Sequence, residues 1–182
     1  MRGVYTLVTA AASATLLQLS FGSDDPEGRL PLRGGMDIAP GGVDGTDHVL
    51  YSPAVARAYD LESMQSVVPR TIAGERFRAF LLSTATEPPE DLDGQYSQAL
   101  ARRLSRMFFE DRDGWTTLDF LGDAFREQTD QDLGKTLAGK AWRFVRDTER
   151  ALRSGRDKRL LAKYAWLVDY MIPRLLNWGV QP

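Results

Sequence analysis

Apolar residues recur at three- and four-residue spacing through most of the second half of this chain. They form stripes over residues 96–108, 115–125, 133–152 and 160–171. This period places apolar side chains on one face of an α-helix, and no alternating run of β-branched residues competes with it. The pattern predicts an all-α fold, a helical bundle of about four main helices over residues 95–182.

Local signals predict where the bundle helices begin and end. Thr129, with Asp132 three residues on, is typical of a capped helix N-terminus. The same helix should end at Ser154-Gly155, and the last should begin near Asp157. Pro173 should kink or stop that last helix, because proline lacks a backbone N–H.

Residues 52–85 predict shorter helices. Ser52-Pro53 is typical of an N-cap followed by proline in the first turn, and this helix should end before Pro69. A second helix is expected over 71–83, followed by an acidic, proline-bearing linker over 86–94. Residues 23–51 are rich in glycine, proline and aspartate, which predicts a flexible, disordered arm.

Residues 1–22 resemble a cleaved export signal. Arg2 precedes an uncharged stretch, and small residues at Ser20 and Gly22 predict cleavage after Gly22. An uncleaved membrane anchor is the alternative, but no basic flank follows the stretch. After cleavage no membrane association is expected. The chain has no cysteine, which fits a bacterial periplasm or a reducing destination reached after secretion.

No catalytic or metal-binding constellation can be composed from the residues. The single histidine, His48, falls in the expected arm, where nothing would hold and tune it. Without cysteine and with one histidine a tetrahedral zinc site is excluded, and two acidic-glycine segments lack the final carboxylate of a calcium loop. We therefore expect no enzyme, no cofactor and no metal.

Charge is distributed unevenly along the bundle. Residues 110–132 are acidic and residues 143–163 are basic, which favours helices of opposite sign packed side by side. A basic face for a nuclear-import receptor or nucleic acid is the alternative, although nucleic acid is not expected. Aromatic residues near the basic stretch suggest a partner surface made of Trp166, Trp178, Arg156, Lys158 and Arg159.

Together the signal, the arm, the absence of cysteine and the helical domain resemble the RxLR effectors of plant-pathogenic oomycetes. The motif-like segments are Arg29-Leu30-Pro31-Leu32-Arg33, with an extra residue between the arginines, and Gly74-Glu75-Arg76, which lacks one acid. Trp142 with Tyr170, or with Tyr164, resembles the core pair of the WY helical fold found in many members.

This resemblance implies a secreted protein that is delivered into the cytoplasm or nucleus of host plant cells. There it would bind host proteins and suppress immunity and cell death. The alternative is an exported, periplasmic helical binding or adaptor protein of a bacterium.

Overall fold

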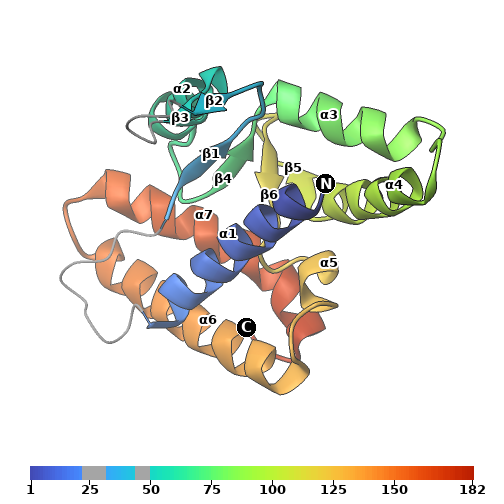
Figure 1. The fold of residues 1–182 in the computed structure, drawn as a ribbon. Helices are drawn as coiled ribbons and strands as arrows, with labels where there is room; N and C mark the ends of the chain where they lie inside the picture. The colour runs from blue at the N-terminus through green and yellow to red at the C-terminus, as the bar shows by residue number, and fades with distance from the viewer. Residues whose placement is uncertain (22–31, 44–49) are drawn as a thin grey trace. The chain divides into compact units, whose positions relative to one another are not determined.

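The computed structural model describes residues 1–21, 32–43 and 50–182 (Figure 1). The chain divides into two compact units: unit 1 comprises residues 1–6 and 33–118, and unit 2 comprises residues 7–32 and 119–182. Helices dominate, with seven α-helices in the described ranges, but six short strands accompany them. The expectation of a mostly helical protein is confirmed, whereas that of a purely all-α fold is wrong.

A four-stranded sheet organises unit 1. Its strand order is β1-β4-β6-β5 (Figure 1). Strands β1 and β4 are parallel, with Gly34 opposite Thr71, and the other neighbours are antiparallel. The strands are β1 (Gly34–Met36), β4 (Thr71–Ala73), β5 (Phe108–Glu110) and β6 (Thr116–Leu118).

Helices, a π-helical turn and a two-stranded sheet make up the rest of unit 1. Ser52 caps α2 through a 3.2 Å hydrogen bond from the Ala54 N–H, which confirms the predicted helix start. Helices α3 and α4 lie side by side, joined by a short connection (Figure 1). The bounds are β2 (Gly42–Val43), β3 (Leu50–Tyr51), α2 (Pro53–Asp60), a π-helical turn (Leu61–Gln65), α3 (Glu75–Thr86) and α4 (Leu92–Ser105).

Unit 2 is built on two long helices, α6 (Gln131–Arg153) and α7 (Lys158–Leu175), which lie side by side (Figure 1). A short helix α5 (Asp123–Arg126) precedes them, and a 3₁₀ turn (Leu176–Trp178) follows α7. The buried face of each long helix follows the predicted period. Its core residues include Leu137, Ala141 and Val145 on α6 and Leu167, Met171 and Leu175 on α7.

Two helix ends differ from the sequence expectation. Asp130 caps α6 by accepting the Leu133 N–H at 2.9 Å, where Thr129 was expected. Pro173 does not stop α7, which continues to the fully buried Leu175. The predicted end at Ser154 and the predicted start at Asp157 are confirmed.

The stripe over 115–125 is not one helix. The chain turns between β5 and β6, where the Asp111 N–H donates to the Trp115 carbonyl at 2.9 Å. Gly114 sits in this turn with φ of 83°, a conformation that glycine adopts without steric penalty. Residues 116–118 of the expected stripe therefore form β6 of this hairpin, and helix α5 is only four residues long.

Helix α1 (Arg2–Phe21) covers the expected export signal. It is apolar and long enough to cross a membrane. Signal sequences and core helices of soluble proteins share this length and composition. Within unit 2 the Ser20 hydroxyl donates to the Leu137 carbonyl of α6 at 2.9 Å. One face of α1 is buried, through Val8, Ala12, Leu16 and Leu19.

Part of the expected flexible arm over residues 23–51 forms strands. Residues 34–36 form β1 and pair with β4, because their extended backbone completes the sheet beside it. Likewise residues 71–73 form β4, so the helix expected from Thr71 begins instead at Glu75. Residues 22–31 and 44–49, including His48 and the predicted cleavage position after Gly22, lie outside the described residues.

Candidate functional site

An apolar groove of about 480 Å³ opens on unit 1 between α3 and the β5 end of the sheet. Its rim carries the charged residues Glu75, Arg78 and Glu110. We call it the apolar groove; the large apolar side chains that line it are Phe77, Leu81, Leu82, Phe108 and Phe109.

Helix α3 supplies both a buried and an exposed face to this groove. Phe77 and Leu81 are one helical turn apart and buried, whereas Leu82 is 65% exposed. The Phe77 ring meets the Phe108 ring of β5 edge to face, with centroids 5.7 Å apart. This aromatic pair fixes α3 against the strand and leaves Leu82 at the solvent side of the groove.

Strand β5 is an edge of the sheet, and its hydrogen-bonding pattern decides what that edge offers. Because the Asp111 N–H donates to the Trp115 carbonyl, Asp111 and Trp115 form a hydrogen-bonded pair of the antiparallel ladder. Pairs alternate along such a ladder, so the backbone groups of Phe108 and Glu110 point away from β6. The groove thus borders a strand edge that carries no further strand in the described part of the chain.

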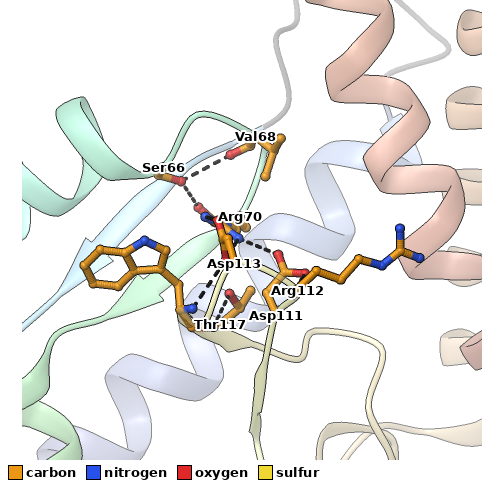
Figure 2. Close-up of polar contacts among 8 residues, drawn as sticks. Ser66, Val68, Arg70, Asp111, Arg112, Asp113 and Thr117 are labelled. Carbon is orange, nitrogen blue, oxygen red and sulfur yellow. Dashed lines mark hydrogen bonds and ion pairs between the residues drawn. The ribbon is translucent and has the colours of Figure 1, made fainter.

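A buried arginine holds this hairpin in place (Figure 2). Arg70 precedes β4, is buried, and forms ion pairs with Asp111 and Asp113 of the β5–β6 turn. Its own carbonyl accepts the Ser66 hydroxyl at 2.7 Å and the Gly34 N–H at 3.0 Å. Figure 2 shows the carboxylates of Asp111 and Asp113 next to the Arg70 side chain.

The electrostatics of this network favour the charged forms. Burial opposes the charge on Arg70, but its hydrogen bonds with Asp113 and Asp111 outweigh that effect and raise the pKa of the guanidinium. The hydrogen bond from Arg70 in turn lowers the pKa of the Asp113 carboxyl, against partial burial. The ion pairs use Nη1 and Nη2 of Arg70, whereas its buried Nε has no hydrogen-bond partner among the described residues. The role of the network is structural, because it holds β5, which lines the apolar groove.

A second polar cluster, in unit 2, joins the segment before α5 to the second half of α7. The Tyr170 hydroxyl donates to Asp119 at 2.8 Å and accepts the Leu121 N–H at 2.9 Å. Arg174 binds both oxygens of Asp119 and lies over the Tyr170 ring, 4.2 Å from its centroid. Burial, with the Asp119 charge, raises the pKa of the Tyr170 phenol well above its usual value. A phenol held neutral in this way acts as a structural crosslink.

The motif-like residues lie apart from one another. Arg29 is outside the described residues, Leu32 is exposed, and Arg33 pairs with Glu62 of the π-helical turn. Glu75 and Arg76 are exposed in the first turn of α3. Of this set, Glu75 reaches the rim of the apolar groove.

The aromatic candidates separate into buried and surface residues. Trp142 and Tyr170 are both buried, and the Tyr170 ring packs on Phe120 and stacks on the half-buried Trp166. Trp178, expected on a partner surface, is 5% exposed, and its indole N–H donates to the Leu121 carbonyl at 2.8 Å. That expectation is wrong, because the 3₁₀ turn after α7 folds the ring back against Phe125.

The basic part of the expected partner surface is at the start of α7. Arg156, Lys158 and Arg159 are exposed there. Because Trp178 is buried, Trp166 is the one tryptophan of the predicted surface that can still contact a partner. The residues that line the apolar groove are different ones and belong to unit 1.

The apolar groove was not foreseen from the sequence. Its signal was present in Phe108-Phe109 followed by the turn sequence Asp111-Arg112-Asp113-Gly114 and then Thr116-Thr117, a hairpin pattern. Among the described residues no group of three or more histidine, cysteine, aspartate or glutamate side chains is placed to hold a metal ion. The arrangement on unit 1 is suited to contact with an apolar ligand or peptide.

Comparison of the chain with protein-family models, curated proteins and solved structures gives no match. Any function is therefore inferred from the residues and their geometry.

Proposed function

We propose that this chain is a secreted effector that works by binding a partner protein and takes an extended apolar segment of that partner into the apolar groove beside β5. As in the oomycete effectors that it resembles, the partner would be a host plant protein. The expected result is suppression of immunity and of defence-related cell death, without catalytic turnover by the effector.

The observation that carries the binding proposal is the groove beside an edge strand. The outward backbone groups of Phe108 and Glu110 can pair with an added strand, which gives affinity through main-chain hydrogen bonds. Alternate side chains of that strand would enter the groove between Phe77 and Leu82. A strand with apolar residues at every second position fits this geometry.

The charged residues at the rim of the groove favour one sign of charge on the bound partner segment. Glu75 and Glu110 carry negative charge there, and Arg78 carries positive charge. The carboxylate excess favours a partner segment with a basic residue beside its apolar ones. Exposed rim charges contribute mainly to the association rate and to partner choice.

Export is supported by the composition of α1, an apolar helix at the N-terminus. Its buried face sets a condition on this part of the proposal. If residues 1–22 are cleaved, the mature protein loses Leu16, Leu19 and the hydrogen bond from Ser20 to Leu137. The secreted effector must then keep unit 1 and its groove folded without α1.

The proposal is tested in plant leaf cells that express either the full chain or residues 23–182 and are then challenged with a cell-death elicitor. Leu82→Asp places a charge at the solvent side of the groove, where a partner's apolar segment would bury it. Leu92→Asp is the matched control, because Leu92 is 79% exposed and lies outside the groove.

We expect the wild type and Leu92→Asp to reduce cell death and Leu82→Asp to lose that effect. Circular dichroism of both purified variants should match the wild type, because both leucines are exposed. If the wild type does not alter elicited cell death in either form, the effector role is wrong. If Leu82→Asp is as active as the wild type, the groove is not the binding surface.

A further inference from the structure

A second pocket, of about 400 Å³, lies between α6 and α7 in unit 2. Most of its lining comes from one face of α6, where Trp142, Arg146, Glu149, Arg150 and Arg153 recur at three- and four-residue spacing. Val168 of α7 closes the opposite side. The pocket is independent of the apolar groove and of the function proposed for it.

Positive charge dominates this lining. Three arginines face one carboxylate, Glu149, which is buried and accepts a 2.7 Å hydrogen bond from Arg153. Arg146 has an exposed partner in Asp147 at 3.2 Å. Arg150 forms no ion pair or hydrogen bond with the described residues. The pocket therefore presents at least one uncompensated guanidinium.

The buried wall of the pocket contributes an unused hydrogen-bond donor. The Trp142 indole N–H is buried and, among the described residues, has no acceptor, although the Trp142 side chain is 5% exposed. Buried donors are almost always paired, since burying one alone is unfavourable. Trp142 lines the basic pocket, so an acceptor that also carries negative charge would suit both this donor and the arginines.

We propose that this pocket binds an oxyanion of the phosphate class, either a free small phosphate or the phosphate of a lipid headgroup. The Arg150 guanidinium binds two of its oxygens, and the Trp142 indole N–H donates to a third. Guanidinium groups match phosphate oxygens in geometry and keep their charge at any physiological pH. Arg146 completes the positive rim and Glu149 holds Arg153 in place.

The test uses the full chain labelled with ¹⁵N and follows its tryptophan indole N–H signals, with the Trp142 signal assigned by Trp142→Phe. Inorganic phosphate and pyrophosphate are titrated first. Vesicles of phosphatidylcholine with and without phosphatidic acid then test the lipid source. We expect the Trp142 signal to shift and saturate with a phosphate probe, while the Trp178 signal, whose N–H already has an acceptor, stays in place.

Arg150→Gln should weaken binding about tenfold or more, because a charge-assisted hydrogen bond is lost. Arg143→Gln is the matched control: it removes the same charge from an exposed position on α6 outside the pocket. A saturating shift with free phosphates identifies a soluble ligand, and one only with phosphatidic acid vesicles identifies a lipid. No shift with any probe, or equal losses in the two variants, overturns the proposal.

Discussion

The Arg70 guanidinium donates hydrogen bonds to both carboxylate oxygens of Asp113, from Nη1 at 2.9 Å and from Nη2 at 2.5 Å. This contact joins the residue that precedes β4 to the turn between β5 and β6, and β6 is the neighbour of β4 in the sheet. The two residues are thus a brace between separate parts of unit 1. The apolar groove depends on that brace, because β5 forms part of its lining.

Replacing Arg70 should destabilise unit 1. Arg70→Met keeps the length of the stem but leaves Asp111, which is largely buried, without its cation. We expect the free energy of unfolding to fall by about 3 kcal/mol, the low end of the range for breaking a buried ion pair. Urea denaturation measures this loss. Arg76→Met, at an exposed position, should change it by less than about 0.5 kcal/mol.

Acid should weaken the same brace. The pKa of Asp113 is lowered in the folded state from its usual value of 3.8, so the stabilisation is present above that value and is lost as the pH falls below it. Asp113→Asn should therefore lower the free energy of unfolding at pH 7 and show a weaker further loss below pH 4. Glu90→Gln, in the exposed α3–α4 connection, should follow the wild-type pH curve. Identical curves for Asp113→Asn and wild type would contradict the pairing.

The sequence predicted the elements whose information is local. Ser52-Pro53, Ser154-Gly155 and Asp157 mark helix ends in the structure, because caps and breakers act through neighbouring backbone groups. The apolar stripes of α6 and α7 also predicted these helices correctly, because each stripe spans several helical turns.

The strands escaped prediction because each is only two or three residues long. Thr71-Ile72-Ala73 is too short to show alternation, and it becomes β4 by pairing with residues far away in the sequence. Trp178 was misplaced for a similar reason: its burial depends on a partner, the Leu121 carbonyl, that no local pattern reveals. The apolar groove combines both kinds of non-local information, since it needs β5 beside α3.

Loss of the Tyr170 hydroxyl should destabilise unit 2 and change its response to alkali. Tyr170→Phe leaves the buried Leu121 N–H without its acceptor, at a cost of about 1–3 kcal/mol. The pKa of Tyr170 is raised in the folded state, so its stabilisation is complete below its usual pKa of 10 and is lost as the pH rises beyond it. The difference between wild type and variant in urea denaturation should hence shrink above pH 10.

Tyr59→Phe provides the comparison for this prediction. Tyr59 is exposed on α2, so removing its hydroxyl should leave both the free energy of unfolding and its alkaline pH dependence unchanged. A Tyr170→Phe protein as stable as wild type at pH 7 would show that the Asp119 cluster does not hold unit 2 together.

Helix α1 is part of the folded full chain, but cleavage of an export signal would remove it from the secreted protein. In the full chain Leu16 is buried whereas its neighbour Leu17 is 41% exposed. Leu16→Ala should therefore lower the free energy of unfolding by about 2–5 kcal/mol, and Leu17→Ala should lower it much less. Equal effects of the two substitutions in urea denaturation would mean that α1 does not pack on the fold.

Cleavage after Gly22 would remove α1 from the mature protein. The export proposal predicts a secreted product that begins at Ser23, which N-terminal sequencing detects directly. Because cleavage removes the buried face of α1 and the hydrogen bond from Ser20 to Leu137, residues 23–182 should unfold at lower urea than the full chain. A secreted product that still begins at Met1 would identify α1 as a permanent core helix, since its packing would then be kept in the mature protein.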